Sequence, residues 1–201
     1  MDHEISRQRL LHILKLAYSG ELAAAYAYRG HWKSVRQQQD KDRIQLIEEE
    51  EWHHRKQVGV LLTRLGEHPD AWKELKARLI GRTIGFLCHV TGWLAPMYGA
   101  GALESRNIKE YEAAARYARD CGCKEYIDCL LTMAEVEWEH EKYFRTQVLG
   151  HPLGRRLPIW PSPPAKERIR LAFMQEAPDN AKQPGNAAPL PDHMLSEPQD
   201  A

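Results

Sequence analysis

The chain has 201 residues, enough for one domain with some tail, and its 28 basic and 28 acidic side chains give a formal net charge of zero. This balance excludes the basic excess of a broad nucleic-acid surface, so we expect no nucleic-acid partner. The 43% hydrophobic and 28% charged fractions indicate a soluble globular protein, and the polar, acidic N-terminus is unlike a signal peptide, so we expect a cytoplasmic location.

The elements expected from the spacing of apolar residues are all helices. Apolar side chains recur every three or four residues in four long stretches, which predicts helices over residues 5–35, 40–65, 83–119 and 124–148. A short helix over residues 70–79 is expected to link the first pair to the second, and Pro96 is expected to kink the third long helix. The apolar start of that helix, residues 84–98, predicts a buried or membrane-interfacial segment, because His89 interrupts it and it is short for a membrane span.

The composition changes after Gly150, where prolines become frequent. We therefore expect a four-helix bundle in residues 1–150, a Pro-rich segment with a short helix over 165–175 in residues 151–176, and a disordered tail in residues 177–201. The four cysteines form no Cys-x-x-Cys motif. They predict reduced thiols in a cytoplasmic protein.

Acidic residues interrupt the apolar stripes of the first and third long helices. Glu21 continues the stripe of Leu14 and Ala17, and Glu104 lines up with Ile108. A carboxylate within an apolar stripe must be paired or must bind something, because its burial alone is costly. Both glutamates are therefore candidate metal ligands.

The second and fourth helices each place a Glu-x-x-His pair on their apolar stripe. The pairs are Glu51 with His54 and Glu137 with His140. One helical turn separates the members of a pair, so both side chains can enter one cavity. Glu50 with His53 is an alternative in the second helix, but it lies on the wetter face, beside Gln57 and Arg64.

The order Glu, Glu-x-x-His, Glu, Glu-x-x-His predicts a site for two metal ions. This ligand set is typical of ferritin-like di-iron bundles. Carboxylates and imidazoles suit iron or manganese, and carboxylates can bridge two metals about 3.5–4 Å apart. We therefore predict an all-α, ferritin-like four-helix bundle with a dinuclear site in its core, holding two iron ions, with manganese as the alternative.

Two tyrosines repeat the same spacing from the lone glutamates. Tyr28 follows Glu21 by seven residues, and Tyr111 follows Glu104 by seven. This parallel predicts two equivalent half-sites. As catalytic residues, the tyrosines would hydrogen-bond the ligand carboxylates or relay electrons and protons; the alternative is that they are core aromatics.

Residues 20–31 read Gly-Glu-Leu-Ala-Ala-Ala-Tyr-Ala-Tyr-Arg-Gly-His. This segment resembles a pattern of the demethoxyubiquinone hydroxylase family, which is part of the ferritin-like superfamily. The family pattern is Gly-Glu-x-x-Ala-x-x-x-Tyr-x-Gly-Gln. The resemblance extends over residues 17–148 through the order of the Glu-x-x-His motifs. His31 stands where the family usually has Gln. The resemblance implies a di-iron monooxygenase of ubiquinone biosynthesis that acts on a quinone ring and associates peripherally with a membrane.

The expected partners are O2, a small apolar or aromatic substrate, an unidentified electron donor and the inner face of a membrane, and a homodimer is left open. Two other functions remain at this point. A rubrerythrin-like peroxidase or ferroxidase would use the same ligands, although the chain lacks the rubredoxin-type Cys pairs of the former. A non-catalytic iron-binding protein is the third possibility.

Overall fold

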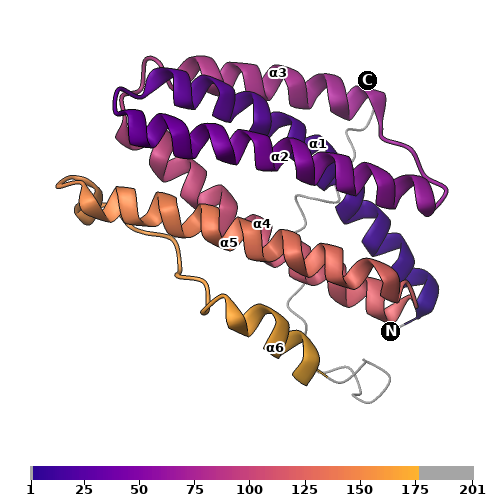
Figure 1. Cartoon of the computed structure of the whole chain (residues 1–201). Coiled ribbons are helices and arrows are strands. Elements are labelled where there is room, and N and C mark those ends of the chain that lie inside the picture. The colour runs from indigo at the N-terminus through magenta and orange to yellow at the C-terminus, as the bar shows by residue number, and fades with distance from the viewer. Residues whose placement is uncertain (1, 177–201) are drawn as a thin grey trace, which may run out of the picture.

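Residues 2–176 are described by the computed structural model, and their regular structure is helical (Figure 1). The α-helices are α1 (His3–Ser34), α2 (Gln38–Arg64), α3 (Ala71–Leu87), α4 (Leu94–Asp120), α5 (Ile127–Gly150) and α6 (Glu167–Gln175). Two short 3₁₀ turns, Lys124–Tyr126 and Gly154–Arg156, precede and follow α5. The predicted all-α class is confirmed.

The helix ends follow local sequence signals. Asp2 caps α1 by accepting a hydrogen bond from the Glu4 amide, and Asp70 caps α3 by accepting from two amides of its first turn. The chain leaves α2 through Gly66 and α4 through Gly122, with φ of 78° and 77°. Glycine adopts this left-handed conformation without steric cost, which explains why both helices stop there.

Helices α1, α2, α4 and α5 form the four-helix bundle, and α3 packs on the outside of α1 as part of the long connection from α2 to α4 (Figure 1). A bundle with one long crossover is the ferritin-like arrangement. The bundle core has an apolar cluster at each end. One cluster includes Leu14, Leu62 and Leu130, and the other includes Ile47 and Phe144.

Each helix of the bundle carries its candidate ligands between these two apolar clusters. In α1, for example, Glu21 lies between Leu14 of one cluster and Ala24 of the other. The acidic residues and histidines therefore form a polar layer enclosed on both sides by packed apolar side chains. Burial of those side chains, each worth about 1.5–3 kcal/mol, supplies the stability that holds the polar layer in place.

The prediction of one long helix over residues 83–119 is wrong, because the helix is interrupted between Leu87, where α3 ends, and Leu94, where α4 begins. Helix α3 continues well past residue 79, and Gly92, with φ of 79°, lies in the turn that separates α3 from α4. Pro96 does not kink a helix. It lies in the first turn of α4, where its missing N–H has no intrahelical partner to lose.

Beyond α5, the Pro-rich segment lies against the bundle. The Trp160 ring packs on Gly101, where a β-carbon would stand 2.3 Å from it, and the indole N–H donates to Glu141 at 2.6 Å. The predicted short helix is present as α6, whose Ile169 is buried in the core. The predicted disordered tail, residues 177–201, lies outside the described residues, and the domain boundary at residue 150 stays a prediction.

Candidate metal centre

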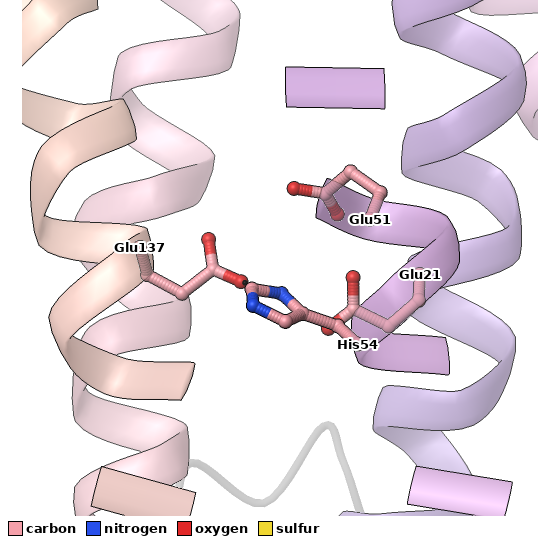
Figure 2. A group of neighbouring side chains, drawn as sticks. All are labelled: Glu21, Glu51, His54 and Glu137. Atoms are coloured by element: carbon pink, nitrogen blue, oxygen red, sulfur yellow. Dashed lines mark ion pairs between the residues drawn. The ribbon is translucent and has the colours of Figure 1, made fainter. Parts of the chain in front are cut away.

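Six buried side chains from four helices meet in the polar layer of the bundle. They comprise two overlapping groups: Glu21, Glu51, His54 and Glu137 (Figure 2), and Glu51, Glu104, Glu137 and His140. Within each group, one ligand-type atom per residue lies within 4.8 Å of every other. These are the six residues that the helical stripes single out. Their binding of metal stays a prediction.

The two groups share Glu51 and Glu137, the carboxylates of the two Glu-x-x-His pairs. Each group is completed by one further glutamate and one histidine. A carboxylate has two oxygens and can therefore bind two metal ions at once. The arrangement accordingly suits two adjacent cations: each group of four would hold one of them, and Glu51 and Glu137 would belong to both groups.

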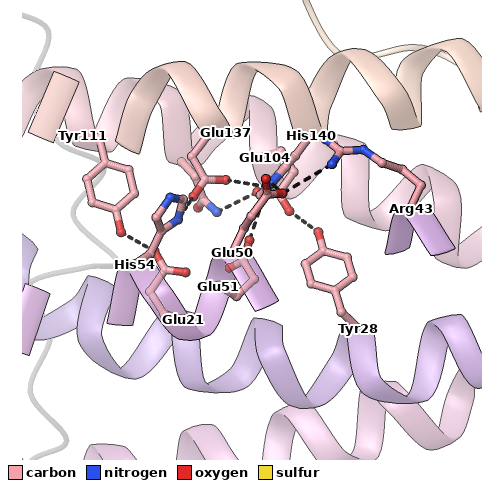
Figure 3. A network of polar contacts seen from close by, with 11 residues as sticks. Glu21, Tyr28, Arg43, Glu50, Glu51, His54, Glu104, Tyr111, Glu137 and His140 are labelled. Carbon is pink, nitrogen blue, oxygen red and sulfur yellow. Dashed lines mark hydrogen bonds and ion pairs between the residues drawn. The ribbon is translucent and has the colours of Figure 1, made fainter. Parts of the chain in front are cut away.

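The histidines point one ring nitrogen at these shared carboxylates. Nδ1 of His54 lies 3.0 Å from Glu137 Oε1, and Nδ1 of His140 lies 3.3 Å from Glu51 Oε1. The second nitrogen of His140, Nε2, lies 2.8 Å from Glu50 Oε2 (Figure 3). A carboxylate on the outer nitrogen of a ligand histidine fixes its tautomer and orientation. Glu50 therefore orients His140 from outside the cluster.

The structure also shows which face of α2 enters the cluster. Glu51 and His54 are buried in the cluster, whereas His53 is exposed and contacts Gln57. Glu50 is half-buried, and besides His140 it contacts Arg43 at 3.4 Å. The alternative pair of Glu50 and His53 therefore does not enter the cluster, although Glu50 touches it from outside.

The two tyrosines cross between the half-sites. Tyr28 on α1 donates to Glu104 on α4, and Tyr111 on α4 donates to Glu21 on α1 (Figure 3). The equal spacing predicted two equivalent half-sites, Glu21 with Tyr28 and Glu104 with Tyr111. In the structure each tyrosine donates to the glutamate of the other half-site. Both phenols are buried, and burial raises the pKa of each well above 10.0, so both remain protonated donors.

Asn107 is a functional neighbour that sequence reasoning missed. Its amide nitrogen donates to Glu104 Oε2 at 2.9 Å, so both oxygens of Glu104 accept a hydrogen bond. Asn107 stands three residues after Glu104, one turn along α4, and this spacing is the signal that would have found it.

Unpaired polar atoms provide a test of whether the cluster fits cations. Within residues 2–176, no hydrogen bond is formed by either carboxylate oxygen of Glu51 or Glu137, by Glu21 Oε2, or by Nδ1 of His54 or His140, although each Nδ1 lies close to a carboxylate oxygen. Buried polar atoms are normally paired, and each orphan is costly. In this cluster, all of these unpaired atoms are carboxylate oxygens or imidazole nitrogens that face one another, and such electron-pair donors are what a cation needs.

The pKa values of the carboxyl groups in the metal-free cluster also indicate a site for cations. Burial, followed by the charges of Glu21 and Glu137, raises the pKa of Glu51 well above 4.5. Burial also raises the pKa of Glu104, with further repulsion from Glu137. Burial acts against ionisation of Glu137 as well, but its contacts with His140 and His54 hold its pKa well below 4.5. Without cations, the cluster must take up protons to offset its negative charge.

Comparison with known proteins agrees with the geometry. Residues 8–148, which include all six clustered side chains, match the family described as "Ubiquinone biosynthesis protein COQ7". Searches of curated proteins and of solved structures gave no significant match. The family match covers more than half of the chain. The chain therefore belongs to the COQ7 family, the ferritin-like di-iron demethoxyubiquinone hydroxylases of ubiquinone biosynthesis.

Proposed function

We propose that the six clustered residues hold two iron ions and that the quinone substrate of the hydroxylation enters through an apolar cavity between α1, α3 and α4. The observation that supports the metal site best is the sharing of Glu51 and Glu137 by two ligand groups. A site for a single cation needs no shared carboxylates, whereas a two-metal site does. The iron pair would supply the electrons that activate O2.

The protein positions the groups around this chemistry and keeps them dry. Tyr28 and Asn107 hold the two oxygens of Glu104, while Tyr111 holds Glu21. Glu50 holds the outer nitrogen of His140. These hydrogen bonds fix the ligand side chains before metal binds, and the two phenols donate directly to Glu104 and Glu21. We propose Tyr28 and Tyr111 as the groups that pass protons to the reacting centre.

A cavity of about 550 Å³ leads from the surface to Tyr28. Its lining is almost entirely apolar and includes Ile80, Ile84 and Leu87 of α3. A smaller cavity of about 240 Å³ reaches Glu21 and Tyr111, and both cavities are lined by Gly20, Ala24 and Leu103. The larger volume is within the usual range for a small-molecule site. We propose that it accepts the apolar substrate and that the smaller cavity leads to the cluster.

The mouth of the larger cavity lies in an apolar surface. Ile80, Ile84 and Leu87 line the cavity and are also exposed, and Leu79 and Phe86 beside them are 68% and 66% exposed. Within residues 2–176, none of the helices has an apolar stretch long enough to cross a bilayer. We propose that this face of α3 rests on the membrane surface, so that a lipid-soluble quinone enters the cavity directly from the bilayer.

Membrane contact is tested by sedimentation with lipid vesicles. Replacing Leu79 and Phe86 together by Ser should release the chain from the vesicles, because it removes two exposed apolar side chains from the proposed face. Leu171→Ser on α6, which is 52% exposed, is the matched control and should leave binding unchanged. Equal binding of both variants and the unmodified protein would contradict this orientation.

The function is tested by giving the iron-loaded, full-length chain a reductant, O2 and a demethoxyubiquinone with a short side chain. Mass spectrometry should detect a product heavier by one oxygen atom, and ¹⁸O₂ should place the label in it. Absence of labelled product from protein that holds two irons would contradict the proposal. Iron uptake far beyond two ions per chain would instead indicate storage.

A further inference from the structure

His31 is a buried polar side chain in the wall of the apolar cavity. Four of the side chains that line the cavity can form hydrogen bonds: Tyr28, His31, Cys88 and Thr91. The Tyr28 hydroxyl donates to Glu104, and the Thr91 hydroxyl donates to the Leu87 carbonyl at 2.9 Å. Burial raises the pKa of Cys88 to about 11, so it remains a neutral thiol and at most a weak donor.

His31 differs from these three side chains because one of its ring nitrogens, Nε2, is buried and unpaired. The side chain is only 2% exposed, and its Nε2 has no hydrogen-bond partner among residues 2–176. A buried ring nitrogen without a partner is unfavourable in the free protein. A ligand that brings an oxygen atom to this ring would remove that penalty.

Neighbouring rings hold the imidazole in one orientation. The His31 ring stacks on Phe144, with centroids 6.0 Å apart and planes inclined by 14°, and lies near-parallel to Tyr28 at 6.4 Å. Burial lowers the pKa of His31 to about 4, against the charge of Asp40. At neutral pH the ring therefore has one N–H donor and one acceptor nitrogen, and it binds neutral oxygen groups without the cost of a buried charge.

We propose that His31 hydrogen-bonds an oxygen substituent of the quinone ring and thereby positions that ring beside Tyr28. This inference rests on the proposed function, because it requires the quinone to occupy the cavity. The remaining lining is alkyl and recognises the substrate by shape and apolar contact. His31 would provide the polar contact that distinguishes a quinone from an apolar molecule of the same size.

The test compares two probes on the full-length, metal-loaded protein: a hexyl-substituted methoxybenzoquinone and hexylbenzene, which has no ring oxygen. Dissociation constants are measured calorimetrically in the same detergent. His31→Leu should weaken quinone binding about tenfold, equivalent to about 1.4 kcal/mol, and leave hexylbenzene binding unchanged. His31→Gln, which retains a donor and an acceptor, should restore quinone binding, and the exposed His53→Leu should have no effect.

Two binding results and one unfolding result would overturn the assignment of His31 while leaving the proposed function intact. One is quinone binding by His31→Leu that equals that of the unmodified protein. The other is an equal loss of both probes, which would make His31 a packing residue. In addition, ligand-free His31→Leu should unfold at the same or a higher urea concentration, because the substitution removes an unpaired buried nitrogen; a clearly lower midpoint also contradicts the proposal.

A separate variant tests whether the quinone occupies the cavity at all, as the proposed function requires. The cavity is filled by Ala27→Trp, which introduces a large ring into its lining. If this variant binds the quinone as tightly as the unmodified protein, the substrate does not occupy the cavity. The role proposed for His31 then fails together with the proposed substrate site.

Discussion

The Tyr28 hydroxyl, on α1, donates a hydrogen bond to Glu104, on α4, the carboxylate of the opposite half-site. Tyr111 makes the reciprocal bond from α4 back to Glu21 on α1. Each tyrosine thus belongs to one half-site and orients the glutamate of the other. The two bonds connect the helices that provide the non-shared glutamates, and they hold those glutamates where the proposed metals would bind.

Tyr28→Phe and Tyr111→Phe should each weaken metal binding about 10–100-fold, because loss of a partner that orients a ligand typically has this effect. Affinity is measured by competition with a chelator of known strength. Tyr143→Phe is the matched control, since Tyr143 donates a similar bond, 2.9 Å long, to Asp40 outside the cluster. It should lower the free energy of unfolding by about 1 kcal/mol without changing metal affinity. Equal affinities in all three variants would contradict the orienting role.

Glu51→Gln should abolish binding of at least one metal and yet stabilise the metal-free protein. Burial and the nearby charges of Glu21 and Glu137 disfavour ionisation of Glu51, and a neutral amide removes that cost. We therefore expect the free energy of unfolding of the metal-free protein to rise. Urea unfolding and metal analysis measure the two effects.

The exposed Glu49→Gln provides the control for this substitution and should change neither quantity. Glu50→Gln tests the contact with His140 and should reduce metal affinity without abolishing it, because Glu50 touches only the outer nitrogen. Retention of both metals by Glu51→Gln would show that Glu51 is not a shared ligand.

The metal-free protein should lose stability as the pH rises above 4.5. The pKa values of Glu21, Glu51 and Glu104 are raised by burial in the folded state, so the folded protein binds more protons than the unfolded chain above that pH. The pKa values of both histidines are also raised; although burial opposes this, their contacts with Glu137 prevail, and the effect has the same sign. The lowered pKa of Glu137 matters only below 4.5, and the pKa of His31, lowered from 6.5 to about 4, opposes the trend only below 6.5.

Urea unfolding of metal-free protein at a series of pH values between 6.5 and 8, where His31 no longer contributes, measures this dependence. Two bound cations should reverse it, because deprotonated ligands bind metal better at higher pH. Metal-free stability that increases with pH over this range would contradict the described arrangement of the carboxylates.

Much of the site could be predicted from the sequence because it depends on local periodicity. The helical repeat puts Glu51 and His54 on the apolar stripe of α2, and it separates them from His53, which is exposed. The approach of Glu50 to His140 could not be predicted in this way. It depends on how α2 and α5 face each other, which is a long-range property.

The same limit applies to the tyrosines and to the break before α4. A spacing of seven residues places Tyr28 on the face of Glu21, but the packing of α1 against α4 decides that its hydroxyl reaches Glu104. Pro96 was expected to disrupt a helix because its ring is incompatible with a helix interior. The chain turns at Gly92, so Pro96 lies in the first turn of the new helix, α4, where it is tolerated.

The close approach of α1 and α3 provides a test of the fold. A β-carbon on Gly30 would stand 2.3 Å from the backbone of Gly85, so Gly30→Ala must push the helices apart and should destabilise the protein by about 1–3 kcal/mol. Gly20, on the same helix, has nothing within 4 Å of that position. Gly20→Ala should therefore stabilise the protein by up to about 1 kcal/mol through helix propensity. Thermal unfolding distinguishes the two, and equal effects would contradict the packing of α3 on α1.

Sharing of Glu51 and Glu137 by two cations is tested by an anaerobic titration of metal-free, full-length protein with Fe(II). We expect saturation at two ions per chain for the unmodified protein, and fewer than two for Glu51→Gln and for Glu137→Gln. Saturation at one ion or none, or two ions bound equally well by both variants, would contradict it.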